Sequence, residues 1–187
     1  MNIFVLDLDP TKCAEYHCNK HLVKMITEHN QILGSIAYTA RGISAKKAIT
    51  PEFVNEHFQG FPRLTEDGKP HPYGIGYKNH PCTSWTAASY DNYVWLCKLN
   101  HEMCKEYTRR YGRTHAGEAI NNWYFENAPS LPSNGMTPFA QAMPEECKNP
   151  DPVIAYRDYY IKYKAKFAKW FNNQTPEWWK TNEYETV

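Results

Sequence analysis

Four stretches of the chain repeat apolar residues at the spacing of an α-helix. This spacing predicts helices over residues 10–38, 83–111, 116–127 and 152–171. The first helix is expected to bury a stripe made of Cys18, Leu22, Met25, Ile26, Ile32, Leu33 and Ile36. The second is expected to bury Trp85, Tyr93, Leu96, Leu99, Met103, Cys104 and Tyr107. The pattern therefore predicts a mainly α fold, a compact bundle of about four helices with long ordered loops.

Capping residues set the expected ends of these helices. Asp9 or Thr11 is suited to cap the first helix, and Gly112 is well placed to end the second. Asp151 followed by Pro152 is the favoured order at the start of the last helix.

The remaining segments read as connections within a single domain over residues 1–187. Residues 2–8 are expected to form a short buried strand or an extended lead-in. Residues 41–81 are rich in Pro and Gly, which predicts a long loop or insertion with a short helix at 51–58. Residues 129–150 form a second connection, and residues 172–187 an aromatic C-terminal tail. Loops of such length are usually functional.

One face of the first predicted helix carries polar groups that suit a shared ligand. His21 and Glu28 lie seven residues apart, almost two helical turns, with Lys24 between them and His17 one turn before. At about 100° per residue, all four fall within an arc of roughly 60°. Such a stripe offers a carboxylate, an amine and two imidazoles to one ligand. A solvated helix face explains the same pattern about equally well.

Composition limits the function classes. No apolar run reaches the length of a membrane span and no signal peptide is visible, so a soluble, cytoplasmic protein is expected. Six scattered cysteines fit reduced core residues better than a disulfide framework. The net charge of +1 argues against a broad phosphate-binding surface. Aromatic residues make up 15% of the chain, enough for both packing and base stacking.

Other candidate sites have plain structural explanations beside them. Cys13, His17 and His21 recur at zinc-ligand spacing, but a fourth ligand is not evident, so no metal or cofactor is expected. Arg109, Arg110 and Arg113 lie near the end of the second predicted helix. They could bind phosphates, or they could be structural cations that satisfy the carbonyls at the helix end.

Three motifs, in order along the chain, resemble the pyrimidine-dimer DNA glycosylase family, which includes the phage endonuclease V. The first is HLVKMITEHNQILG, in which His21, Leu22, Glu28 and Gly34 fall at the family spacing. The second is the opening MNIFVLD together with YKNHP, which contains Asn79 and His80 and looks like the bacterial branch. The third is TPEWWK, where Pro176, Trp178 and Lys180 match an aromatic, DNA-facing tail.

The resemblance implies a helical, base-flipping DNA N-glycosylase and abasic-site lyase in a bacterial or phage-infected cell. In that family the α-amine attacks the sugar C1′, and an essential helix glutamate corresponds to Glu28. Asn2 is larger than the residue exposed in the phage enzyme, so the nucleophilic amine is expected to belong to Met1. Lys24 is the substitute amine if the terminus is blocked.

The resemblance also suggests how double-stranded DNA is held. His21 and His17 would orient the substrate, together with Asn79 and His80. The groups expected to hold phosphates or bases are Lys20, Arg109, Arg110, Arg113, Trp178 and Lys180.

Two rival functions stay open on the sequence. The near-neutral charge suits an enzyme or binding protein for a free nucleotide or nucleoside-like ligand, which needs no extended basic track. A non-catalytic nucleic-acid-binding module is the other. Replacing Glu28 would leave such a module intact and would abolish either enzyme.

Overall fold

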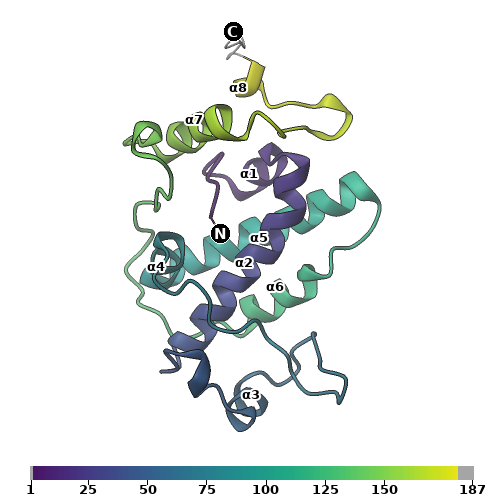
Figure 1. Ribbon diagram of the computed structural model, residues 1–187, viewed down its shortest axis with the longest axis vertical. Helices are drawn as coiled ribbons and strands as arrows, with labels where there is room; N and C mark the ends of the chain where they lie inside the picture. Colours follow the sequence, from purple (N-terminus) through teal and green to yellow (C-terminus); the bar gives the residue numbers. More distant parts are fainter. Residues whose placement is uncertain (1, 181–187) are drawn as a thin grey trace.

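The computed structural model describes residues 2–180, apart from the side chain of residue 180, and is mainly helical (Figure 1). The described helices are α1 (Pro10–Tyr16), α2 (Asn19–Thr39), α3 (Pro51–His57), α4 (Pro81–Ala88), α5 (Tyr90–Tyr111), α6 (Gly117–Glu126), α7 (Pro152–Lys164) and α8 (Glu177–Lys180). Three short 3₁₀ turns join them at Lys46–Ala48, Glu145–Cys147 and Phe171–Asn173. The mainly helical class is confirmed. The count of about four helices is wrong, because eight α-helices are described.

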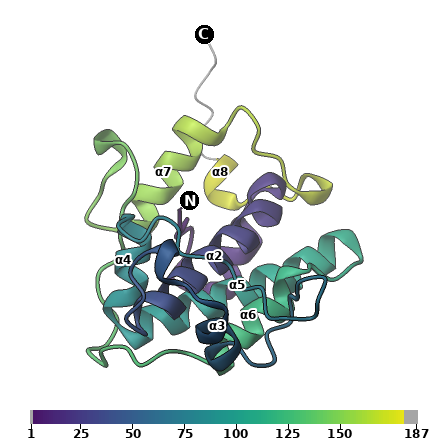
Figure 2. The same ribbon diagram turned by 60° about the horizontal axis from the view of Figure 1, so that its bottom comes forward.

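The long helices α2 and α5 form the centre of the molecule. They pack against each other, while α1 and α6 pack on α5, and α4 contacts both central helices (Figures 1 and 2). Every residue of the two apolar stripes predicted from the sequence is buried. All six cysteines are free and buried, which agrees with their interpretation as core residues. None of the described helices is both long and apolar enough to cross a bilayer.

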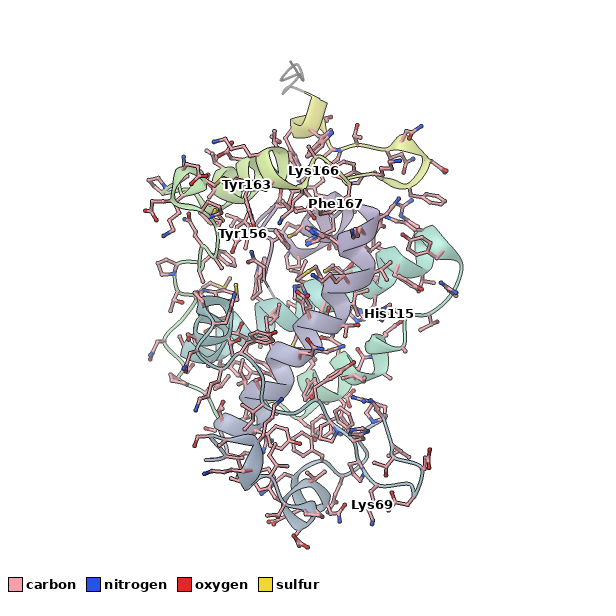
Figure 3. The ribbon with its side chains drawn as sticks, in the orientation of Figure 1. Lys69, His115, Tyr156, Tyr163, Lys166 and Phe167 are labelled. Atoms are coloured by element: carbon pink, nitrogen blue, oxygen red, sulfur yellow. The ribbon has the colours of Figure 1, made fainter. Side chains whose placement is uncertain are left out.

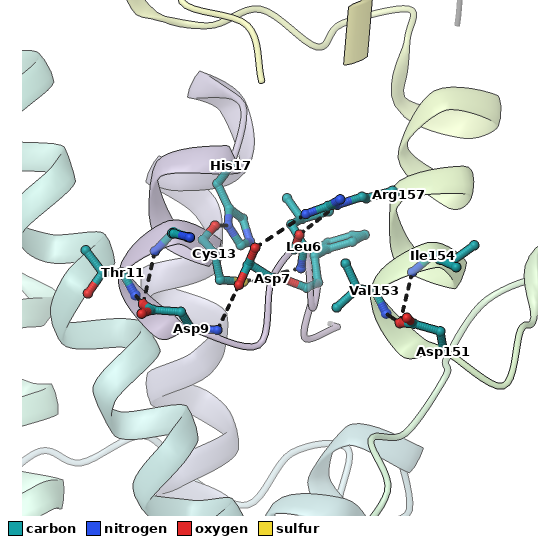
Figure 4. Close-up of polar contacts among 12 residues, drawn as sticks. Leu6, Asp7, Asp9, Thr11, Cys13, His17, Asp151, Val153, Ile154 and Arg157 are labelled. Carbon is teal, nitrogen blue, oxygen red and sulfur yellow. Dashed lines mark hydrogen bonds and ion pairs between the residues drawn. The ribbon is translucent and has the colours of Figure 1, made fainter. Parts of the chain in front are cut away.

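The first predicted helix is divided in two, which corrects the sequence-based expectation. Asp9 does cap α1, accepting hydrogen bonds from the amides of residues 11 and 12 (Figure 4). However, His17 and Cys18 adopt extended backbone angles before α2 begins. Buried Arg110 satisfies the groups exposed at this break. Its guanidinium donates to the carbonyls of Glu15 and His17 and to the Asn19 side chain, each at 2.9 Å.

The second predicted helix also contains a break, at Ser89. Its backbone is extended, and its hydroxyl accepts the amide of Asp91, so Ser89 caps a new helix, α5. The same hydroxyl donates to the Gly135 carbonyl at 2.6 Å. Gly112 ends α5 with a φ of +65°, as predicted.

The last long helix starts as predicted but ends early. Asp151 caps α7 at its N-terminus (Figure 4). The helix ends at Lys164 and not near Phe171, because the following residues bond to the α1–α2 junction. The Lys169 carbonyl accepts the Asn19 amide at 2.8 Å, and the Trp170 indole donates to the Tyr16 carbonyl at 2.9 Å.

The residue 41–81 segment is an ordered loop that wraps α2. Its predicted short helix is α3, one residue shorter than expected. The rings of Phe58 and Phe61 are fully buried against Trp123. Further on, the backbone of Tyr73 lies against Gly34 of α2, so closely that an added Cβ would come within 2.9 Å of the Tyr73 carbonyl.

Residues 2–6 form a buried, extended segment among α2, α4 and α7, as the sequence suggested (Figure 1). The Asn2 side chain accepts hydrogen bonds from Tyr156 at 3.0 Å and from Cys82 at 3.3 Å. Arg157 of α7 donates to the Leu6 carbonyl at 2.9 Å (Figure 4). The start of the described chain is therefore held firmly in the interior.

Candidate functional site

The outward face of α2 carries a polar stripe formed by Lys20, Lys24, Glu28 and Gln31. Lys24 and Glu28 form an ion pair at 3.0 Å, one turn apart. The Lys24 side chain is 59% exposed, whereas that of Glu28 is only 15% exposed. The Glu28 carboxylate thus lies where the open face of the helix meets the packed interior.

His21 is not part of this open stripe, although its spacing along the chain placed it there. Its ring stacks on Phe4 at 4.5 Å between ring centres, and its Nδ1 hydrogen-bonds the Tyr160 hydroxyl at 2.6 Å. Phe167 covers another side, over the first turns of α2 (Figure 3). Burial lowers the pKa of His21 to about 3. At neutral pH His21 is an uncharged residue of the core.

His17 is also separated from the stripe. It ends α1 and does not belong to α2, and its Nδ1 hydrogen-bonds the Cys13 carbonyl at 2.7 Å. It is completely buried, and burial lowers its pKa to about 3. The predicted shared surface of two imidazoles, an amine and a carboxylate is therefore wrong for both histidines. Among residues 2–180, no group of three or more His, Cys, Asp or Glu is arranged to hold a metal ion.

His80 of the YKNHP motif lies close enough to Glu28 for the two side chains to interact electrostatically. His29, next to Glu28, is near the Asn2 backbone, and burial lowers its pKa to about 4. His80 caps α4, accepting the Cys82 amide at 3.2 Å. Burial lowers the pKa of His80, while the nearby charge of Glu28 opposes the shift. Asn79 is exposed beside it, and Met1 lies outside the described residues.

Each of the three arginines already has a hydrogen-bond partner within the protein. Arg110 is buried and bonded to Glu106 and to the α1–α2 junction. Arg109 is exposed but directs two donors to Glu106, both at 2.6 Å. Arg113 donates to the Tyr107 hydroxyl at 3.0 Å. Arg109 and Arg110 line a polar cleft of about 580 Å³ at the end of α5, and neither Lys24 nor Glu28 lines it.

In the described part of the aromatic tail, the tryptophan rings pack on other aromatic side chains. The Trp178 ring meets Tyr16 and Tyr160 edge-on and lies under the Arg157 guanidinium, 5.3 Å away. Trp179 packs on Trp170. The side chain of Lys180 lies outside the described residues.

One feature near the stripe escaped the sequence analysis. A cavity of about 250 Å³ is lined by Gln31, Lys46 and the segment from Tyr73 to Tyr77. Tyr77 is 70% exposed and has a φ of +52°. The glycines of YGIGY suggested only a loop, and the exposed ring becomes evident only in three dimensions.

Comparison with known protein families identifies a match. The family of pyrimidine dimer DNA glycosylases matches residues 1–118, which covers more than half of the chain. The matched range contains Glu28, the 41–81 loop, His80 and all of α5. No curated protein matches, and no solved structure does. The chain therefore belongs to the pyrimidine dimer DNA glycosylase family.

Proposed function

We propose that this protein is a DNA N-glycosylase with abasic-site lyase activity, acting on a damaged pyrimidine in double-stranded DNA through an amine nucleophile and Glu28. The observation that carries the proposal is the family match over residues 1–118. The position of Glu28 supports it, because a carboxylate at the edge of an open face can reach both substrate and interior.

Glu28 has two tasks in this chemistry. Cleavage of the glycosidic bond develops positive charge on the sugar, which a nearby carboxylate stabilises. The attack of an amine on C1′ also releases a proton that the carboxylate can accept. The partial burial of Glu28 strengthens both effects, because water screens the carboxylate less.

The α-amine of the first residue suits the role of nucleophile better than Lys24 does. An α-amino group ordinarily has a pKa of about 7.7–8, so a useful fraction is neutral near pH 7. Lys24 forms an ion pair with Glu28 at 3.0 Å, and its attack on C1′ would have to break that pair. Asn2, the next residue, is anchored by the hydrogen bonds that its side chain accepts from Cys82 and Tyr156.

Lysines around the first turns of α2 supply the positive charge for phosphates. The Lys20 amine lies 4.7 Å from the centre of the Phe167 ring. Lys164 of α7 lies 4.5 Å from the Tyr159 ring centre, and the charges of Lys24 and Lys164 both act on His21. These three lysines border the same end of the stripe that carries Glu28.

Borohydride trapping on a duplex with one abasic site tests the proposal. The wild type is expected to form one covalent adduct, which peptide mapping assigns to the N-terminal peptide. Lys24→Met should still be trapped. Glu28→Gln should slow cleavage of dimer-containing DNA by about 10²–10⁴-fold. Absence of any adduct would rule out the proposed lyase activity. An adduct on the peptide that contains Lys24 would identify Lys24 as the nucleophile.

A further inference from the structure

The most exposed large hydrophobic side chain among those described is Tyr77, in the loop just before the YKNHP histidine. Most aromatic rings of this chain pack against one another, but Tyr77 is 70% exposed. A ring left in water adds little to folding, so the Tyr77 side chain is free to contact a ligand.

The backbone beneath Tyr77 is rigidly attached to α2. The Ser35 hydroxyl donates a hydrogen bond to the Gly76 carbonyl at 2.7 Å, and it accepts one from the Gly76 amide at 2.9 Å. On the other side, the His80 amide donates to the Tyr77 carbonyl at 2.8 Å. The ring therefore projects from a fixed support and not from a loose loop.

The conformation of Tyr77 is costly. Its φ of +52° lies in the left-handed region, which residues other than glycine, asparagine and aspartate rarely adopt. Glycine would fit this position without strain. The chain thus carries a tyrosine where folding alone favours glycine, and such exceptions concentrate at functional sites.

The support places Tyr77 at a defined distance from the polar stripe that carries Glu28. Ser35 lies seven residues after Glu28 on α2, about 10 Å along the helix axis, which is about three base steps of DNA. Tyr77 lines the cavity of about 250 Å³ together with Gln31 and Tyr73. Exposed Lys46 borders the same cavity.

We propose that Tyr77 inserts its ring into the DNA and stacks on bases beside the damaged nucleotide, so that it determines selectivity for a disrupted duplex. This inference rests on the proposed glycosylase function and deepens it. Every base offers a flat face for stacking, so the contact requires no particular sequence. A gap in the base stack admits the ring, whereas an intact stack does not.

Binding to two duplexes tests the inference, one undamaged and one containing a stable tetrahydrofuran abasic-site analogue. Tyr77→Ala should weaken binding to the analogue duplex by about ten- to a hundredfold and leave binding to the undamaged duplex unchanged. Tyr77→Phe and Tyr77→Trp should retain the affinity. Lys20→Ala should weaken both duplexes equally, because phosphates are present in each. Tyr90→Ala, which removes another exposed tyrosine, should change neither.

Tyr77→Gly separates folding from DNA contact. It should raise the Tm or leave it unchanged, because the left-handed backbone is relaxed, and yet it should lose selectivity as Tyr77→Ala does. A marked fall in the Tm of Tyr77→Gly would overturn the inference. So would a Tyr77→Ala protein that prefers the analogue duplex as strongly as the wild type does. Cleavage of dimer-containing DNA reports separately on the proposed function. If the wild type cleaves and Tyr77→Ala keeps full selectivity, only the inference fails.

Discussion

At the scale of single residues, the histidines of the first two helices are the clearest case of a pattern that the interior reinterprets. His17 and His21 are spaced as ligands would be, yet both are buried, as is His29, and burial lowers the pKa of each. These rings are core groups that stay neutral, and their cost appears only when acid charges them.

Acid should therefore destabilise the protein well above the pH at which carboxylates titrate. The unfolded histidines take up protons below about pH 6.5, while the folded pKa values are about 3, 3 and 4. Above about pH 6.5 the buried histidines cost no stability. As the pH drops toward 4, the free energy of unfolding falls by at most about 1.4 kcal/mol per pH unit for each histidine.

Urea unfolding at pH 7.5 and at pH 5.5 measures this loss. The exposed His101 provides a control, because His101→Asn should leave the pH dependence unchanged. Equal stability at the two pH values would show that the buried rings are not kept neutral.

At the scale of elements, one arginine allows two helices to meet where the sequence suggested a single helix. The end of α1 leaves carbonyls without partners, and Arg110 from α5 supplies the donors. Glu106 balances its charge at 2.6 Å. Arg110 therefore links α1, α2 and α5 at this junction.

Arg110→Lys should cost about 3–5 kcal/mol of unfolding free energy, because one ammonium cannot replace the fork of donors and leaves buried groups unpaired. Its neighbour Arg109 is the matched control. Arg109 contacts the same Glu106 but is 53% exposed, so Arg109→Lys should cost no more than about 1 kcal/mol. Chemical denaturation compares the two variants, and equal losses would contradict the assignment of Arg110 as the junction residue.

At the scale of the whole molecule, positive charge gathers in one region although the chain carries almost no net charge. The net charge of +1 does not require a nearly neutral binding face. Lys20, Lys24 and Lys164 gather at one end of the α2 stripe, while the loop tip that carries Lys69 lies at the opposite end of the molecule (Figure 3). A short basic patch suits contact with a few phosphates around one damaged nucleotide.

Salt dependence tests this arrangement and distinguishes DNA from a free nucleotide ligand. About three to five phosphate contacts predict a slope of log K against log salt near −3 to −4.5. Lys20→Ala or Lys164→Ala should reduce the slope by about 1 each, and Lys69→Ala should not change it. DNA binding without a salt slope would favour the small-ligand alternative.

Helix patterning and caps were readable from the sequence because they depend on neighbouring residues. The stripe that contains Leu22 and Ile36 is buried as its spacing predicted, and Gly112 and Asp151 act at the helix ends as expected. The breaks at Cys18 and Ser89 were not readable, because their hydrogen-bond partners come from distant segments: Arg110 and Lys169 at the first, and Gly135 at the second.

The sequence by itself determined the helical class, the family motifs and the glutamate on α2, since periodicity and motif spacing are properties of the chain alone. Tertiary structure decided which of the spaced polar groups meet solvent. It buried His17 and His21 under α7, left the Lys24–Glu28 pair at the surface and exposed Tyr77 on its support. Spacing along a helix defines a direction for each side chain, but only packing determines whether water or another helix lies there.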